Sequence, residues 1–236
     1  MRPTRGTATV AGVFFLVTEI AAIGGLALYR PALRDAGYVL GAGADTRVAL
    51  GALCEIVLAA AVVGTGVTLF PVLRRRNEAA ALGYACARLL EAAVILVGLV
   101  SVLAVLTLRR DFASGADTDA GSLATAARAL VAVHDWTFLL GPNIVLGANT
   151  LVLACLLYRA GLVPRSVAVL GLVGGPLICA SAVAVLFGLY EQVSVAGSLA
   201  ALPVFAWEVS LAVRLIARGF GSGSAATARA AAPLPA

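Results

Sequence analysis

Six long apolar stretches run through the sequence, and they constrain the possible folds more than any other feature. Each is about 20 residues or longer, the length that an α-helix needs to cross the hydrocarbon core of a membrane. They lie at about residues 8–29, 48–70, 80–107, 131–158, 166–188 and 194–217. Only 12% of the residues are charged, against about 25% in soluble domains. The sequence therefore predicts an all-α polytopic membrane protein, with six transmembrane helices in one bundle over residues 1–220.

The fourth stretch has an uncertain start, because apolar residues extend back to Leu123. One helix over 123–158 would be ~54 Å long, far more than the ~30 Å of a bilayer core. We therefore expect a break before about Val131, with 123–130 forming a short helix at the interface. At the other end of the chain, residues 221–236 are mostly small and end in Pro-Ala, which predicts a disordered cytoplasmic tail.

The distribution of arginines predicts the orientation of these helices. If the N-terminus lies inside, the inner segments hold ten arginines and the outer loops hold six. Because cytoplasmic loops carry an excess of basic residues, we expect both termini in the cytoplasm and the chain in the plasma membrane. Basic residues in the short inner loops are expected to contact lipid headgroups. These residues are Arg74, Arg75, Arg76, Arg159 and Arg165.

Several classes of function find no support in the sequence. The net charge of +5 follows the membrane topology, so nucleic acid is not an expected partner. The cysteines lie singly in apolar runs and His134 is the one histidine, so we expect no metal site and no cofactor. Neither a nucleophile-elbow, a zinc-protease nor a phosphate-loop motif occurs, and no catalytic residue is assigned.

Charged side chains inside the predicted helices are the main functional signal. The ionisable residues are Glu19, Glu55, Arg88, Glu91, His134, Asp135 and Glu208, and two amides, Asn143 and Asn149, accompany them. Each bare charge at mid-membrane costs about 2.5–3.5 kcal/mol. The five acids together would cost roughly 12–17 kcal/mol, as much as the whole stability of a typical domain. They must therefore be paired, protonated or in contact with a water-filled cavity.

Depth divides these residues into two tiers. Arg88 and Glu208 lie ~12–13 Å from the inner ends of their helices. Glu91 and Glu19 lie ~16 Å from theirs. Arg88 and Glu91 are three residues apart on one helical face, and a guanidinium has more donors than one carboxylate can use. We therefore predict a polar hub of Arg88, Glu91, Glu208 and Glu19. A second tier nearer the outer face comprises Glu55, His134, Asp135 and Asn143.

Three interpretations of this hub remain open. It binds or conducts a small polar ligand, an ion or a proton, which is the usual role of intramembrane ionisable residues. Alternatively, its ion pairs only fix the packing of the helices. A third interpretation is an intramembrane enzyme that uses Glu91 and Glu208 as an acid–base couple. His134 is interpreted as an interfacial or capping residue rather than a ligand.

Prolines and glycines add two local expectations. Pro142 interrupts the fourth helix and frees carbonyls near Asn143 that could line a cavity, although prolines are also ordinary in membrane helices. Gly171 and Gly175 form a small-xxx-small pattern, which predicts close helix packing.

Three stretches carry a resemblance to a known family. They are LFPVLRRRNEAAALGYACARLLE (69–91), LLYRAGLVPRSVAVLGLVG (156–174) and PVFAWEVSLAVRLIARGF (203–220). The sequence resembles the bacterial integral-membrane family of domain of unknown function 4386 over most of residues 8–220. The resemblance implies a six-helix protein of the bacterial inner membrane and brings no established activity. The recurrent polar positions of that family match Arg88, Glu91, Tyr158, Arg159, Pro164, Arg165 and Glu208.

Overall fold

The computed structural model describes residues 5–35, 37–41, 43, 45–115 and 119–221. The helices are α1 (Arg5–Arg34), α2 (Asp45–Leu73), α3 (Glu78–Ala113), α4 (Ala120–Leu139), the π-helix η1 (Leu140–Val145), α5 (Leu146–Ala160), α6 (Arg165–Leu186) and α7 (Val195–Arg218). Because α4, η1 and α5 run on without interruption, they form one long segment, and six helices are long and apolar enough to cross a membrane. The all-α, six-helix prediction is confirmed for the described residues. The predicted tail lies, from residue 222 onward, outside them.

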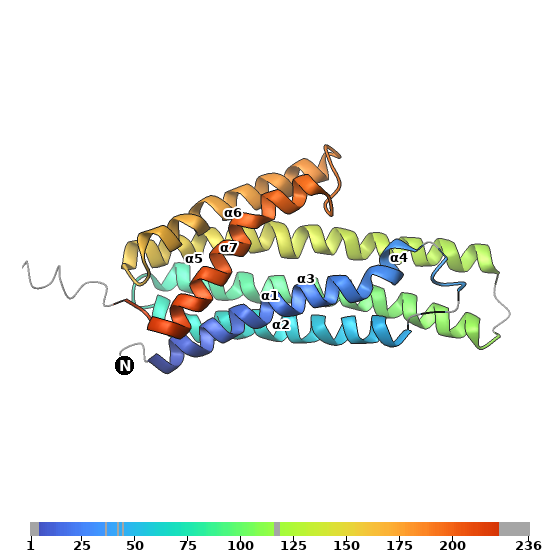
Figure 1. Cartoon of the computed structure of the whole chain (residues 1–236), viewed down its shortest axis with the longest axis horizontal. Helices are drawn as coiled ribbons and strands as arrows, with labels where there is room; N and C mark the ends of the chain where they lie inside the picture. The colour runs from blue at the N-terminus through green and yellow to red at the C-terminus, as the bar shows by residue number, and fades with distance from the viewer. Residues whose placement is uncertain (1–4, 36, 42, 44, 116–118, 222–236) are drawn as a thin grey trace, which may run out of the picture.

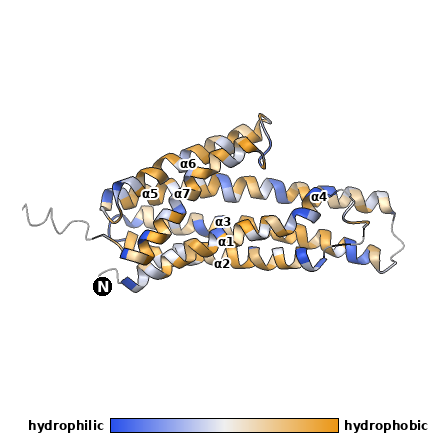
Figure 2. Cartoon of the chain, in the orientation of Figure 1, coloured by the Kyte–Doolittle hydropathy of each residue, from blue (hydrophilic) through white to orange (hydrophobic). Residues whose placement is uncertain are grey.

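The helices lie side by side along one long axis (Figure 1), and their contacts follow a closed ring. Each helix contacts the next one along the chain, and α7 returns to pack against α1. The start of α1 and the end of α7 therefore lie at the same end of the bundle, which we call the terminal end; the opposite end is the distal end. Figure 2 shows hydrophobic residues along most of each helix, with hydrophilic residues gathered mainly near the helix ends.

Local sequence signals set the helix boundaries. Asn77 caps α3 by accepting a hydrogen bond from a backbone N–H three residues on, and Asp119 and Ser194 cap α4 and α7 in the same way. Such caps satisfy N–H groups that have no partner within the helix. Gly161 ends α5 in the left-handed region at φ 61°, and Pro164 occupies the position before the first residue of α6 without a capping hydrogen bond from its side chain. The turns at 74–77 and 161–164 are short, so the helices they join are antiparallel.

The expected break before Val131 is wrong. Helix α4 begins at Ala120 and continues past this point, and α3 is 36 residues long, or ~54 Å. Ala127 of α4 is buried in one cluster with Val105 of α3, and Ala124 packs against that cluster; Leu123 is also buried. The two helices therefore extend beyond a bilayer thickness as a packed hairpin at the distal end. The apolar residues of 123–130 suggest an interfacial helix from the sequence, but in the structure this segment contributes to the contact between α3 and α4.

Pro142 is accommodated by the π-helix η1. Proline lacks a backbone N–H, and a π-turn accommodates the resulting gap in the hydrogen-bond ladder without ending the helix. Gly141 in this turn lies close to α3, because a Cβ there would be 3.1 Å from a methyl of Val94. One consequence is that the faces of α5 are rotated relative to those of α4.

Helix α6 packs through its glycines. A Cβ at Gly174 would lie 2.8 Å from the backbone nitrogen of Val204 on α7, and one at Gly175 would lie 2.7 Å from the carbonyl oxygen of Gly147 on α5. These distances leave no room for a side chain. The small-residue pattern that begins at Gly171 therefore serves the close packing that it predicts.

An apolar core fills the terminal end of the ring. We call it the terminal core; its members each have 0% exposure and are Ala8, Ala11, Leu69, Leu73, Ala81, Tyr84, Leu211 and Leu215. They come from α1, α2, α3 and α7. This core closes the inside of the bundle toward the terminal end.

Candidate functional site

Arg88 lies on α3, points into the ring and is only 1% exposed. Helix α2 makes room for it with Gly66, where a Cβ would come within 3.2 Å of the Cβ of Arg88. The guanidinium carbon lies 5.5 Å from the ring centres of both Phe15 and Tyr84, within the range of cation–π attraction. The surroundings of Arg88 thus include two aromatic rings as well as acids.

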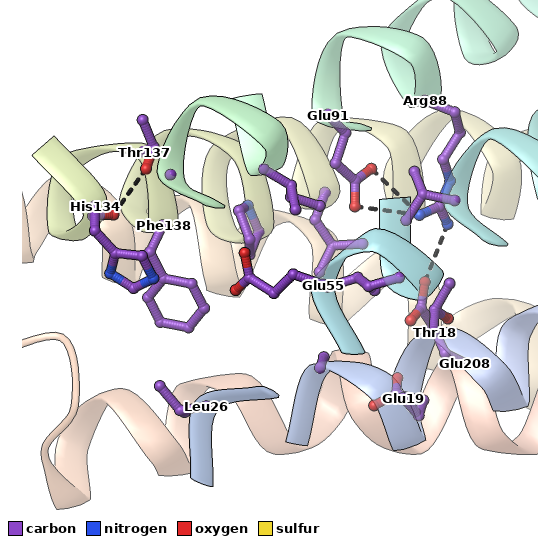
Figure 3. A pocket seen from close by; sticks show the side chains of 17 residues that line it. Thr18, Glu19, Leu26, Glu55, Arg88, Glu91, His134, Thr137, Phe138 and Glu208 are labelled. Carbon is purple, nitrogen blue, oxygen red and sulfur yellow. Dashed lines mark hydrogen bonds and ion pairs between the residues drawn. The ribbon is translucent and has the colours of Figure 1, made fainter. Parts of the chain in front are cut away.

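The guanidinium of Arg88 bonds to two carboxylates. Its Nη1 lies 3.2 Å from Oε2 of Glu91, and its Nη2 lies 3.0 Å from Oε1 of Glu208 on α7 (Figure 3). Its Nε donates to the hydroxyl of Tyr84 at 3.1 Å. The pairing expected from the i, i+3 spacing is therefore present, and Glu208 is the second acid. Tyr84 was not anticipated, although it stands one turn before Arg88 on the same face.

Glu19 of α1 is half-buried and completes the hub. Figure 3 shows it beside Glu208, and its carboxyl group interacts electrostatically with Glu208 and Arg88. Among the described residues, Arg88 forms ion pairs with Glu91 and Glu208 but not with Glu19. The structure thus gathers the four predicted hub residues, with three carboxyl groups around one guanidinium.

Asn149 of α5 belongs to the hub although the prediction placed Asn143 in a site and not Asn149. Its Nδ2 donates to Oε2 of Glu91 at 2.8 Å, and the residue is 1% exposed. Within the described part of the chain its Oδ1 has no hydrogen-bond partner. Asn143 lies in η1 and is half-buried. The π-turn that contains Asn143 changes which later positions face inward, so helical spacing alone could not select Asn149.

A cavity of about 110 Å³ extends from the hub along the inside of the ring. It has room for several water molecules. All four predicted hub residues line it, together with Glu55 of α2, His134 of α4 and Pro142 of η1. In Figure 3, Glu55 lies between the group around Arg88 and the group around His134. The walls between these polar groups are mainly apolar.

The predicted outer tier is divided by the structure. Glu55 and His134 line the cavity, whereas the side chain of Asp135 is 66% exposed. His134 is buried within α4, with Tyr29 edge-on at 5.9 Å and Phe138 stacked at 6.3 Å. The interpretation of His134 as a capping residue is therefore wrong, because it lies inside a helix among aromatic rings; its position at the membrane interface stays a prediction.

A larger groove opens at the distal end beside this cavity. We call it the distal groove; its volume is about 1010 Å³, and its walls come from α1, α4, the end of α6 and the connection between α6 and α7. Leu26, His134 and Phe138 line both the groove and the cavity. These three side chains form the junction between the two spaces. The distal groove thus adjoins the cavity on its distal side, while the terminal core fills the opposite end.

The remaining predicted residues lie at the terminal end. The arginines expected to contact lipid are all exposed there: Arg74, Arg75, Arg76, Arg159 and Arg165. Contact with headgroups remains a prediction for them. Among the described residues no three His, Cys, Asp or Glu side chains are close enough to hold a metal ion.

An unanticipated ion pair lies at the distal end. Arg109 of α3 lies past the third predicted apolar stretch (80–107); it is 6% exposed, and its Nη1 lies 2.8 Å from Oδ1 of Asp45 at the start of α2. The ring of Tyr38 lies 5.6 Å from its guanidinium carbon. Burial and the charge of Asp45 raise the pKa of Tyr38 to about 12. This cluster ties the connection between α1 and α2 to the end of α3.

The comparisons with known proteins place the chain in a family. No curated protein matches it, and no solved structure matches it. A family model described as "Domain of unknown function (DUF4386)" matches residues 10–219, a range that contains every residue of the hub. The chain is therefore an integral membrane protein that belongs to the family of domain of unknown function 4386.

Proposed function

We propose that this protein binds protons or small cations in the cavity beside Arg88. The observation that carries the proposal is the excess of acids: Glu19, Glu91 and Glu208 surround one guanidinium. With all four groups ionised, one positive and three negative charges leave a net charge of −2 in a buried space. A net charge of that size is unfavourable in an apolar medium. Bound protons or cations would neutralise it, whereas an anion would add to it.

The acids beyond the ion pairs favour binding over a purely structural role. Fixing the packing of α3 against α7 requires only Arg88 and its two partners. Glu19 and Glu55 are additional, half-buried carboxyl groups that form no ion pair within the described part of the chain. Each would cost about 2.5–3.5 kcal/mol as a bare charge in the membrane. A packing device gains nothing from them, but a cation site does.

We also propose that both termini face the cytoplasm and that the membrane is the plasma membrane. The terminal end carries the exposed arginines of the turns at 74–76 and 159–165, which suits the cytoplasmic side. Each arginine near an anionic surface contributes about 1 kcal/mol to lipid attraction. With this orientation, the distal groove opens toward the outside of the cell.

Thermal unfolding in lipid nanodiscs tests the cation site. The melting temperature should change with pH, and at fixed pH it should rise with the concentration of a small cation such as sodium or ethylammonium. Glu19→Gln removes one of the surplus acids, so it should reduce both responses. Glu78→Gln is the matched control, because Glu78 is exposed at the start of α3.

The responses of the wild type, Glu19→Gln and Glu78→Gln decide whether the cavity is a cation site. If neither pH nor cations shift the melting temperature of the wild type, the cavity is not a cation site. The same conclusion follows if Glu19→Gln and Glu78→Gln change the responses equally.

A further inference from the structure

The distal groove has the size and the chemistry of a ligand site. Its volume of about 1010 Å³ is at the upper end of the range for small-molecule pockets, roughly 300–1,000 Å³. Most of its wall is apolar, including Ile23 and Leu33 of α1 and Trp136 of α4. The connection between α6 and α7 forms another wall and is held in place by a 2.7 Å hydrogen bond from the hydroxyl of Tyr190 to Oγ of Ser181.

The rim of the groove does not select one sign of charge. Arg30 and Arg34 stand on it, but so do Asp135 and Glu191. Selection is expected deeper, where the groove meets the cavity at Leu26, His134 and Phe138. The next charged side chain that lines the cavity is Glu55, and beyond it lies the hub with its three carboxyl groups.

An ammonium group fits the cavity better than a bare metal ion does. An ammonium has three N–H donors and no acceptor. The cavity offers the carboxylates of Glu55 and Glu19 as acceptors. The ring of Phe138 at the junction adds an aromatic face to which a cation is attracted. A volume of about 110 Å³ accommodates such a head group but no long chain.

We propose that the ligand is an amphiphilic ammonium ion, with its head in the cavity and its apolar chain in the distal groove. This inference rests on the proposed cation site and adds the substrate class. The two spaces adjoin each other, because Leu26, His134 and Phe138 line both, and their chemistry is opposite: carboxylates inside and apolar walls outside. An amphiphile dissolved at the distal membrane interface matches both.

The test uses octylammonium, ethylammonium and octanoate with the protein in nanodiscs. Trp136 lies in the groove and is 51% exposed, whereas Trp207 is fully buried, so changes in tryptophan emission report on the groove. Each buried methylene tightens binding about fourfold. Octylammonium should therefore bind at least tenfold more tightly than ethylammonium, and octanoate should show no saturable binding at the same concentrations.

Two variants test whether the alkyl chain of the ligand lies at the junction and in the distal groove. Leu26→Phe narrows the junction and should weaken octylammonium at least threefold. Ile20→Phe adds the same ring on the lipid-facing side of α1, where Ile20 is 71% exposed, and should leave binding unchanged. Melting temperatures of both variants show whether they are folded.

Two binding results, and one result from the melting temperatures, would overturn the inference. Equal binding of octanoate and octylammonium would show that the groove accepts any acyl chain. Equal binding of ethylammonium and octylammonium, with no effect of Leu26→Phe, would show that the cation site exists but that the groove does not hold its ligand. In both cases the proposed cation function survives if pH and cations still shift the melting temperature. If they do not, both proposals fail.

Discussion

Replacing Arg88 with methionine tests the central arrangement of this structure. Methionine keeps an unbranched apolar stem but removes the guanidinium that is bonded to Glu91, Glu208 and Tyr84. Two of these bonds are charge-assisted, and each such bond is worth about 1.5–3 kcal/mol. Removing one member of a buried ion pair costs about 3–5 kcal/mol in measured cases. We therefore expect Arg88→Met to lower the free energy of unfolding by about 4 kcal/mol.

Equilibrium unfolding by sodium dodecyl sulfate in mixed micelles measures this loss. Helix content from circular dichroism can be followed together with the emission of Trp207, which has 0% exposure. Adding Glu91→Leu and Glu208→Leu to Arg88→Met removes the stranded carboxylates and should restore most of the stability. A loss below about 1 kcal/mol in the single variant would refute the reasoning, because two buried carboxylates left without their partner must be costly.

The same triple variant separates the two leading interpretations of the hub. If the ion pairs only fix packing, the triple variant should fold, and neither it nor the wild type should show a melting temperature that rises with cation concentration. If the hub is the cation site, the variant should fold but lose that dependence.

The remaining predictions concern other parts of the fold. Gly174→Ala should lower the free energy of unfolding by about 1–3 kcal/mol through overpacking, because its Cβ meets the backbone of α7; Gly83→Ala, with open space around it, should instead gain ~0.5–1 kcal/mol. Asp45→Asn should lower it by about 1–3 kcal/mol, since the buried Arg109 loses its charged partner. Asp119 caps α4, and its hydrogen bonds from Ser122 hold its pKa below the ordinary 3.8. Its capping should therefore be complete above pH 3.8 and be lost as the pH falls through the lower folded value, which a carboxyl titration by NMR would show as a midpoint below 3.8.

The sequence predicts the helices and the charged residues of the hub because both follow from one-dimensional quantities. Helix length and hydropathy locate the membrane-spanning segments. Counting 1.5 Å per residue from the helix ends places Arg88 and Glu208 at one level, although they are 120 positions apart in the chain. The high cost of a bare charge in lipid then requires them to pair.

Rotation about a helix axis is the quantity that could not be predicted. The π-turn at Leu140–Val145 shifts the face of every later residue in the segment, so the interior position falls at Asn149 and not at Asn143. The length of α3 and α4 beyond the membrane was missed for a related reason. Hydropathy does not distinguish an apolar face that lies in the interface from one that packs on another helix. Arg109 lies past the predicted third stretch, but α3 continues through it and the residue is buried.

The closed terminal core limits how the hub can work. The cavity adjoins the distal groove at Leu26, His134 and Phe138, but toward the terminal end it meets side chains with 0% exposure. Helices α1 and α7 are in tight contact there, since a Cβ at Gly12 would lie 2.7 Å from the carbonyl oxygen of Ala212. Release to that side would require these two helices to separate, as in proteins that open to the two faces of the membrane in turn. A continuous pore is therefore incompatible with this conformation, and a binding site with access from the distal end fits it.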